Sequence, residues 1–530
     1  MIRGFFLTNY AYMFEAKGIQ RYIFASGKLR DVVGASDMVA ALANSDPKDE
    51  IGKLLHSLNC ADSLFSRRAG GAFCLHSNDK SWLRTVRAHW RIWVMTHMPG
   101  LEFSEAFGEG ANEIKAMHDC FENAGGIRHN MAADVMPYGR PISRIAPLTG
   151  RPAIEERSYS GDKVLIDAIT KPQRDWADQS VHVMGSIARR FVHDPDSCTF
   201  PRDFDPVRET KCEAANPLFP FRDDGKDRRI AIVHADLSGL GELFRKMGET
   251  FKTAKENFAL AKAIEDAISD AAKAASALLY PAKQGSLMPA RPVLLGGDDI
   301  TIIVRADLAL AFAEKLLIEI ETLCAAIEQA KDRDALSACA GIAIVRPGTP
   351  FLTASHLAES LCNHAKRAVK AKGKIDHAGR KGYASGLSFY LQHQTALESA
   401  DDVYKASIGA GGAVLHANPY GLGERADALG HPTFERLTTL AVTLNEIEGG
   451  HSALREIKML LSENKAQAEA RWRRWWEHGG RRQPNKMDAL KALLTNGAAF
   501  PSDDQIGILF DALILIDLGA VAEQTMATAA

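Results

Sequence analysis

Two adjacent aspartates, Asp298 and Asp299, are the residues of this 530-residue chain whose types and spacing most clearly suggest a chemical role. They lie in VLLGGDDITIIV (293–304), where two glycines and two aspartates separate two runs of strand-forming residues. This pattern predicts a β-hairpin whose turn bears two carboxylates side by side. A tight turn needs Gly or Asp, but rarely both carboxylates together. On its own the hairpin pattern therefore leaves two interpretations: the aspartates either only form the turn or bind a metal.

A third carboxylate ends an earlier strand. The segment RRIAIVHADLSGLGELFRKMG predicts a strand from Ile230 to Ala235 that ends at Asp236, followed by a turn and a helix. In a sheet of β-α-β-β-α-β order, the first strand lies beside the hairpin strands, so the three carboxylates should converge. Converging carboxylates repel one another unless cations lie between them, and Mg²⁺ or Mn²⁺ prefer such oxygen ligands.

Glycine-rich turns surround these carboxylates. Gly296 and Gly297 permit unusual backbone angles and leave room for a ligand against the hairpin. Backbone N–H groups at a strand-to-helix turn can bind a triphosphate. The residues of that turn are Ser238, Gly239, Leu240 and Gly241. Together, the turn and the carboxylates predict metal-dependent chemistry on a nucleotide.

The elements that must position these residues divide the chain into four parts. Residues 1–150 form a first α+β unit, and residues 151–228 form a connector rich in proline and charge, with one helix at about 163–192. Residues 229–430 form a second α+β unit in β-α-β-β-α-β order, the ferredoxin-like arrangement. Residues 431–530 have a helical pattern almost throughout.

The first unit carries a similar hairpin without the carboxylates. In RRAGGAFCLH (67–76), Ala72 and Phe73 stand where the second unit has two aspartates, so this hairpin cannot bind metal in the same way. Its glycines are expected either to admit an adenosine or to pack the two units face to face. Glu15, at the end of the first strand, is interpreted as structural.

Composition limits the remaining possibilities. Hydrophobic residues make up 46% and charged residues 25% of the chain, and the net charge is −2, so any nucleic-acid binding must be local. No signal peptide and no apolar run long enough to cross a membrane is found, which predicts a cytoplasmic protein without membrane contact. The eight cysteines include no Cys-x-x-Cys pair, and the spacing of His193, Cys198 and Cys212 fits no zinc pattern.

A tryptophan–arginine stretch, ARWRRWWEHGGRRQPNK (470–486), allows two interpretations. Trp472, Trp475 and Trp476 share one face of a helix, which favours an apolar stripe packed within the helical domain. Alternatively, the stretch could stack on bases and contact phosphates. Its candidates for an RNA or protein contact are Arg473, Arg474, Arg481 and Arg482.

The Gly-Gly-Asp-Asp hairpin, the HADLSGLGELF junction and the later ACAGIAIV and AESLCNHAKRAVKAKG segments resemble the palm domains of the large subunit of type III CRISPR effectors. They resemble GGDEF diguanylate cyclases more distantly. MFEAKGIQRYIFASGKLRDVVGAS resembles the family's other palm, so the resemblance covers roughly residues 10–400. It implies an α+β protein with two ferredoxin-like palms, the first degenerate and the second catalytic, and an all-helical C-terminal domain.

The resemblance also implies an activity. Related proteins convert ATP to cyclic oligoadenylate, so we expect a nucleotidyltransferase that makes a cyclic oligoadenylate or cyclic dinucleotide messenger plus pyrophosphate in antiviral signalling. Two Mg²⁺ or Mn²⁺ ions would be held by Asp236, Asp298, Asp299 and the backbone carbonyl of Leu237. Lys366 matches a basic position that faces the triphosphate in related cyclases. Arg367 and Lys370 either share that role or belong to a solvated helix face.

Departures from the family keep alternatives open. The family's N-terminal HD nuclease domain and its four-cysteine zinc module have no counterpart in this sequence, so a stand-alone or streamlined cyclase in an antiviral operon is a serious option. The alternatives are an RNA-binding scaffold subunit of a CRISPR effector complex and a GTP-using diguanylate-type cyclase. The expected partners are ATP, RNA or effector subunits, and a downstream protein that senses the cyclic nucleotide. A homo-oligomer stays open.

Overall fold

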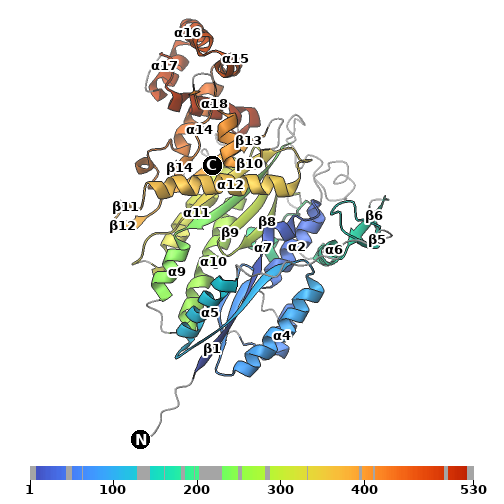
Figure 1. Ribbon diagram of the computed structural model, residues 1–530. Helices are drawn as coiled ribbons and strands as arrows, with labels where there is room; N and C mark the ends of the chain where they lie inside the picture. The colour runs from blue at the N-terminus through green and yellow to red at the C-terminus, as the bar shows by residue number, and fades with distance from the viewer. Residues whose placement is uncertain are drawn as a thin grey trace.

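The structure is a computed structural model with two α+β domains and a group of C-terminal helices. In Figure 1 the first α+β domain lies at one end of the molecule and the C-terminal helices lie at the other. The predicted α+β architecture is confirmed, whereas the predicted domain boundaries stay predictions. The structure describes residues 8–42, 50–61, 64–127, 144–159, 162–180, 186–195, 197–201, 229–248, 253–280, 287–330, 332–392, 397–409, 412–494 and 499–521.

The first domain has a four-stranded antiparallel sheet of order β2-β3-β1-β4, which is the ferredoxin-like order. Its strands are β1 (Asn9–Lys17), β2 (Phe65–Ala69), β3 (Ala72–Ser77) and β4 (Glu102–Gly110). Its helices are α1 (Ile19–Ile23), α2 (Leu29–Ala41), α3 (Glu50–Ser57), α4 (Lys80–His97) and α5 (Glu113–Ile127). The first domain therefore has the ferredoxin-like arrangement that the resemblance implied.

The second domain repeats this arrangement and extends it. Its sheet has the order β14-β13-β10-β7-β9-β8. The strands are β7 (Ile230–Ser238), β8 (Ala290–Gly296), β9 (Asp299–Arg305), β10 (Ser337–Val345), β13 (Ser385–Leu391) and β14 (Tyr420–Leu422). The main helices are α9 (Leu240–Gly248), α10 (Ala254–Ser276), α11 (Ala309–Ala325) and α12 (Phe351–Ala371).

The predicted order of elements in this domain ended at α12 and missed β13 and β14. β13 runs parallel to β10, so β10, α12 and β13 form a crossover unit added to the ferredoxin-like core. Its sequence, SGLSFYL, alternates Leu387, Phe389 and Leu391 with Ser388 and Tyr390, a strand pattern that the prediction overlooked. A ribbon of β11 (Ile375–His377) and β12 (Arg380–Gly382) precedes it.

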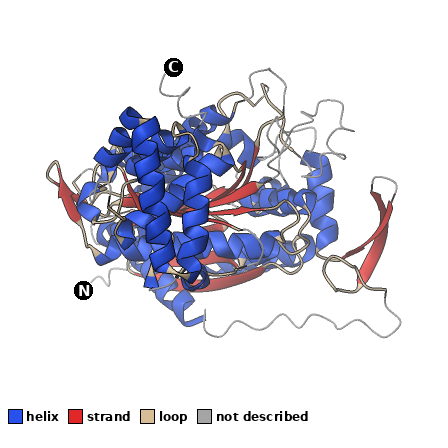
Figure 2. Cartoon of the chain, turned by 90° about the horizontal axis from the view of Figure 1, so that it is seen from above, coloured by secondary structure: helices blue, strands red, loops and turns tan. Residues whose placement is uncertain are grey.

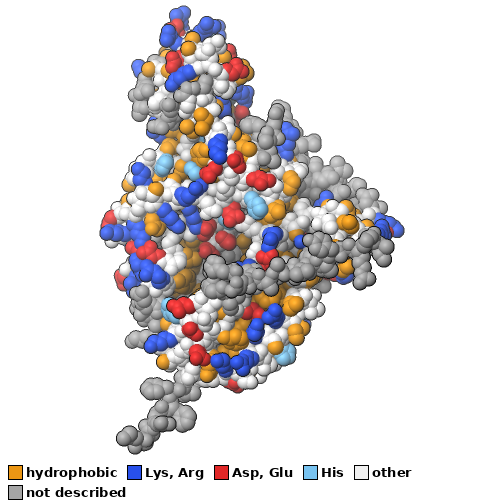
Figure 3. Space-filling view, in the orientation of Figure 1, with side chains coloured by type: hydrophobic (Ala, Val, Ile, Leu, Met, Phe, Trp, Pro, Cys, Tyr) orange, Lys and Arg blue, Asp and Glu red, His pale blue; other side chains and the backbone are white. Residues whose placement is uncertain are grey.

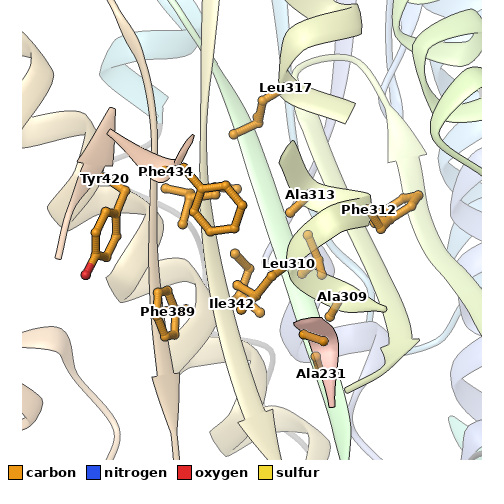
Figure 4. Packing of buried hydrophobic residues seen from close by; sticks show 14 of the residues in the cluster. Ala231, Ala309, Leu310, Phe312, Ala313, Leu317, Ile342, Phe389, Tyr420 and Phe434 are labelled. Carbon is orange, nitrogen blue, oxygen red and sulfur yellow. The ribbon is translucent and has the colours of Figure 1, made fainter. Parts of the chain in front are cut away.

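Alternation along β7 separates the two faces of the larger sheet. Ala231, Val233 and Ala235 point into a core shared with α10, α11 and the C-terminal helices, part of which is shown in Figure 4. Ile230 and Ile232 point to the opposite face, into a core shared with α12 and the first domain. Because side chains alternate between faces, Asp236 lies on the α12 side of the sheet.

The two domains pack reciprocally. α10 of the second domain contacts β2 of the first, and α2 of the first contacts β8 of the second. The α10 contact includes a hydrogen bond in which Asn257 Nδ2 donates to the Ser66 carbonyl at 2.8 Å. This exchange brings the edge strands of the two sheets, and therefore their hairpins, next to each other.

The connector contains a ribbon that we did not predict. β5 (Ala153–Tyr159) pairs with β6 (Asp162–Asp167), and the ribbon projects from the body at one side in Figure 2. The helix predicted at about 163–192 is wrong over β6. α6 (Thr170–Ser180) begins only after Asp167, whose carboxylate accepts hydrogen bonds from the backbone N–H of Thr170 and its neighbour. α7 (Ser186–Phe191) follows it.

The C-terminal helices confirm the helical prediction for this part. They are α14 (Phe434–Asn445), α15 (Gly450–Glu463), α16 (Lys465–Arg482), α17 (Pro484–Leu493) and α18 (Asp503–Leu518). Trp472 and Trp475 are buried in the core, with Trp476 packed beside them. The interpretation of the tryptophans as an apolar stripe is therefore confirmed.

Two sequence expectations concern cysteines and membranes. Each cysteine within the described ranges is free, and Cys198 is buried among apolar residues, whereas Cys212 lies outside the described residues. Searched over its described part, the chain has no helix that is both long and apolar enough to span a membrane.

Candidate active site

Asp236 and Asp299 lie directly opposite each other on the antiparallel strands β7 and β9. Directly opposed residues of an antiparallel pair project from the same face with their Cβ atoms about 5 Å apart. Asp298 precedes Asp299 in the exposed hairpin turn, and Gly296 pairs with Asp299 on the other side. The predicted convergence of the three aspartates on one region of the sheet is therefore confirmed, with two of them as cross-strand neighbours.

Negative charge is crowded at this position. Burial, reinforced by the carboxylates of Asp298, Asp236 and Glu359, raises the pKa of Asp299 to about 7. Burial also raises the pKa of Asp236, while Lys366 acts in the opposite direction. Glu359 lies on α12 and was not predicted as a site residue. Its position two helical turns before Lys366 was the signal that could have found it.

Lys366 provides the positive charge nearest to the aspartates. From α12, its ammonium donates hydrogen bonds to Asp236 Oδ2 and, at 2.9 Å, to the backbone carbonyl of Leu237. Its side chain is 13% exposed. The two oxygens that accept from Lys366 are two of those predicted to ligate a metal.

The other two basic residues of α12 do not reach the aspartates. Arg367 is exposed and lies 3.5 Å from Asp401, and Lys370 is exposed on the last turns of the helix. Arg367 therefore fits the second of its two predicted roles, that of a residue on a solvated helix face. Lys370 is close enough for its charge to lower the pKa of Asp236.

The donor set fits a hard divalent cation. Carboxylate and backbone carbonyl oxygens are the ligands of Mg²⁺ and Mn²⁺. Burial and, after it, neighbouring carboxylates raise the pKa of Asp236 and of Asp299, and a bound cation would favour the charged form of both groups. As the side chains stand, no three Asp, Glu, His or Cys residues of the described ranges are gathered tightly enough to hold a metal, and Asp236 is engaged by Lys366.

The predicted phosphate turn is one residue long. β7 continues through Asp236 to Ser238, and α9 begins at Leu240, so Gly239 alone connects them, with φ at +91°. Only glycine adopts such an angle readily. Ser238 is buried, with its hydroxyl 4.0 Å from Cys339 Sγ. The turn can therefore offer an anion the N–H groups that begin α9, but not the Ser238 hydroxyl.

A pocket that the sequence did not predict opens beside Gly239. Lys374 donates hydrogen bonds to Glu242 and Asp334, and Lys246 also pairs with Asp334. The pocket is further lined by Leu243, Arg333, Ala335, Leu336 and Tyr383. These residues come from α9, the loop before β10 and the region after α12. No local spacing could have linked them.

The two glycine hairpins touch. A Cβ atom on Gly70 would lie 3.6 Å from Gly297 Cα, and Gly296 O is 3.7 Å from the same point. Gly70 and Gly297 both have positive φ, of +61° and +65°. Of the two expectations for the glycines of the first hairpin, the packing of the two domains against each other is confirmed.

The predicted register of the first hairpin against the second is wrong by one residue. Ala72 lies opposite Glu15 in the first sheet, as Asp299 lies opposite Asp236 in the second. Gly71 and Ala72 are therefore the counterparts of the two aspartates, and not Ala72 and Phe73 as predicted. Gly70–Gly71 lies one position later in the first turn than Gly296–Gly297 does in the second. Aligning the two hairpins by these glycines therefore shifts the register by one residue.

The remaining residues of the sequence analysis lie away from this site. The four candidate arginines lie on the exposed side of α16. They are Arg473, Arg474, Arg481 and Arg482. Helix α16 is at the end of the molecule opposite the first domain (Figure 1), where Figure 3 shows Lys and Arg side chains on the surface. Glu15 pairs with Lys17 at 2.5 Å, which agrees with its structural interpretation.

Comparisons with known proteins address the identity of the second domain. Residues 229–375 match the family model "Cas10/Cmr2, second palm domain". This segment is therefore similar to a palm domain of the Cas10/Cmr2 family. The match begins at β7 and ends in β11, and so includes Asp236, the Asp298–Asp299 hairpin and Lys366.

Solved structures extend the likeness to the rest of the fold. A Csm1–Csm4 cassette in complex with one ATP is 13% identical, with a TM-score of 0.51, and the match covers 96% of this chain and 70% of that one. Csm1 in T. onnurineus is 14% identical, with a TM-score of 0.48 and coverage of 97% and 70%. The first match shows that the two-domain architecture around this palm-like segment is shared. A sequence comparison with curated proteins finds no match.

Proposed function

We propose that this protein is a nucleotidyltransferase that converts ATP to a cyclic oligoadenylate or cyclic dinucleotide and releases pyrophosphate. The observation that carries the proposal is the cross-strand pair Asp236–Asp299 beside Asp298, within the segment that is similar to a palm domain of the Cas10/Cmr2 family. Two Mg²⁺ or Mn²⁺ ions per site would be held by these aspartates and the Leu237 carbonyl. When bound, such ions lower the pKa of the attacking hydroxyl and stabilise charge on the phosphates.

The residues of the chain have separate tasks in this proposal. The N–H groups at the start of α9 donate to phosphate oxygens, because the positive end of a helix dipole favours anions. Lys366 supplies an ammonium for the triphosphate, and Lys370 is one turn further along the same helix. The Gly70 and Gly297 turns pack backbone against backbone at the domain junction, because neither glycine bears a side chain. Positioning and charge stabilisation supply most of the catalysis in phosphoryl transfer.

The choice of ATP is supported by the relatives. The similar Csm1–Csm4 cassettes have been solved in complex with ATP, with AMPPNP and with cyclic oligoadenylates of three and four units, cA3 and cA4. We extend the same nucleotide to this chain. A GTP-using diguanylate-type cyclase is the rival within the same chemistry.

An incubation with labelled nucleotide tests the proposal. Purified protein is mixed with α-labelled ATP and Mg²⁺ or Mn²⁺, with and without candidate RNAs, and the products are separated by chromatography. We expect a cyclic adenylate product that unlabelled ATP competes away and GTP does not. A product made only from GTP would support the diguanylate alternative. Release of pyrophosphate from neither nucleotide would contradict both.

A second candidate function is favoured by a separate observation. The four arginines on the exposed side of α16 make that face basic in a chain whose net charge is −2. Such a face suits an RNA backbone, which is what a scaffold subunit of a CRISPR effector complex would contact. The intact aspartates speak against a purely structural role. Synthesis and RNA contact are compatible, since the two surfaces are well separated (Figure 1).

The proposed product implies further partners. A cyclic nucleotide messenger requires a downstream protein that senses it, in antiviral signalling of the type III CRISPR kind or a related kind. Effector subunits are expected partners because the similar Csm1 chain with one ATP was solved as a cassette with Csm4. Co-purification of small RNA or other subunits with the tagged chain distinguishes a complex from a stand-alone enzyme or homo-oligomer.

A further inference from the structure

Lys366 occupies the position of a cation. Its ammonium donates to Asp236 Oδ2 and to the Leu237 carbonyl oxygen, two neighbouring oxygens at the end of β7. The Lys366 side chain is 13% exposed and that of Asp236 is 24% exposed, so this pair is only partly open to water. An ammonium in such a place neutralises a carboxylate that would otherwise be buried without a counter-charge.

α12 holds Lys366 over these oxygens. Gly341 of β10 allows the helix to approach, because a Cβ atom there would lie 2.0 Å from the Ala358 carbonyl oxygen. Cys362 Sγ also donates to the Cys339 carbonyl at 3.1 Å, one turn before Lys366. The backbone of Lys366 is therefore fixed by close packing of helix against sheet. Only its four-carbon side chain can change the position of the charge.

An ammonium and a metal ion cannot use these two oxygens together. A Mg²⁺ ion binds oxygen at about 2.0–2.1 Å, so an ion bound to both oxygens would stand where the ammonium now lies. Two cations so close would repel each other strongly in a partly buried site. Lys366 must therefore leave Asp236 and Leu237 before a metal can bind both of them.

We propose that Lys366 is an exchangeable internal cation, which occupies the metal position in the nucleotide-free protein and moves to the triphosphate when the nucleotide binds. The inference rests on the proposed function and deepens it, because it makes metal and nucleotide binding interdependent. The nucleotide gives the ammonium a new anionic partner, and its departure frees the oxygens for the metal. By thermodynamic linkage, each ligand then raises the affinity for the other.

Metal binding without nucleotide tests this inference directly. Free Mn²⁺ is measured by electron paramagnetic resonance during titration of the nucleotide-free protein. Lys366→Met keeps the length of the side chain and removes its charge, and should bind Mn²⁺ about tenfold more tightly than the wild type, the equivalent of losing one charged hydrogen bond. Lys366→Arg keeps a positive charge and should bind as weakly as the wild type. Lys315→Met, on an exposed part of α11 where Lys315 pairs with Glu319, controls for net charge and should match the wild type.

Nucleotide affinity supplies the opposite readout. AMPPNP binding is measured by calorimetry in the presence of a chelator, so that metal does not contribute. Lys366→Met should weaken this binding while it strengthens Mn²⁺ binding, whereas damage to the fold would weaken both. Thermal melting of each variant checks folding, and Lys366→Gln replaces Lys366→Met if the latter melts early.

The outcomes separate the inference from the proposed function. Equal Mn²⁺ affinity in the wild type and Lys366→Met would overturn the inference, as would an equal gain in Lys315→Met. Both of these outcomes leave the metal site of the proposed function intact. Absence of Mn²⁺ binding in every variant, with and without AMPPNP, would contradict the metal site itself and the proposed function with it.

Discussion

Asp236 and Asp299 face each other across the antiparallel strands β7 and β9, so the second domain carries two like charges at a position where a sheet normally avoids them. Both carboxyl groups are partly buried, and burial raises both of their pKa values. Lys366 compensates for one of the two charges. A cross-strand pair of this kind reduces stability unless a ligand uses it, which is typical of a functional site.

Removal of one of the two charges should stabilise the metal-free protein. We expect Asp299→Asn to raise the free energy of unfolding in a chelator by about 1 kcal/mol, because it relieves repulsion from Asp236 and Asp298. Urea unfolding at pH 8 measures the difference. Asp266→Asn, on the exposed side of α10, serves as the control and should change little.

Added Mg²⁺ should reverse this order. A millimolar concentration of Mg²⁺ is expected to stabilise the wild type more than Asp299→Asn, since a ligand that binds the folded state adds more to stability the more tightly it binds. If Asp299→Asn unfolds more easily than the wild type in chelator, the account of crowded charge at this pair is wrong.

Gly341 should be intolerant of any side chain. A Cβ atom would meet Ala358 O at 2.0 Å and Cys362 N at 2.3 Å, so Gly341→Ala must push α12 away from β10. We expect a loss of roughly 1–3 kcal/mol in unfolding free energy, as for overpacked cores, and a larger loss of activity, because α12 carries Lys366. Gly348→Ala, with nothing within 4 Å of the new atom, is the matched control. Equal melting temperatures for the two variants would contradict the packing described.

Asp511 should make stability depend on pH. Burial raises its pKa from 3.8 to about 7, although the Ala417 N–H, the Tyr420 hydroxyl and nearby Lys458 act to lower it. Between these pKa values the folded state binds a proton that the unfolded state does not, so stability falls as the pH rises from about 4 to 7. From pH 5 to pH 8, the wild type should lose about 2 kcal/mol more than Asp511→Asn. Parallel pH profiles in urea unfolding would refute this.

The arginines of α16 should bind an RNA backbone without sequence preference. Replacement of Arg473, Arg474, Arg481 and Arg482 by Gln should weaken single-stranded RNA binding and flatten its salt dependence by about 0.7 in log–log slope for each phosphate that is no longer neutralised. Replacement of the same residues by Lys keeps the charge and should preserve the slope. Fluorescence anisotropy at several salt concentrations gives both quantities. An unchanged slope in the Gln variant would assign this face to a protein partner or to solvent.

Local sequence was sufficient to predict the elements around the Asp298–Asp299 hairpin. The apolar runs of β7 and β9, the Gly-Gly turn and the single glycine before α9 are local features, and the convergence of Asp236 with Asp299 followed from strand order. The buried face of α16 was also readable, because Trp472 and Trp475 recur at helical spacing.

Features that depend on contacts between distant segments could not be predicted from the sequence. Nothing near Lys366 indicates that it contacts Asp236 and the Leu237 carbonyl, since that contact depends on how closely α12 approaches the sheet. The pocket beside Gly239 gathers residues from three segments. The register of the first hairpin was misread because glycines mark a turn without fixing which of its positions they occupy.

The most direct test of the central claim is pyrophosphate release from ATP in the wild type and in Asp236→Asn and Asp299→Asn, with Mn²⁺ and an activating RNA. Asp266→Asn is carried as the control. We predict release by the wild type and the control, and a loss of at least about a hundredfold in both site variants, because the charge-stabilising ligands would be missing. Undiminished release in either site variant would contradict the assignment of this aspartate pair as the catalytic centre.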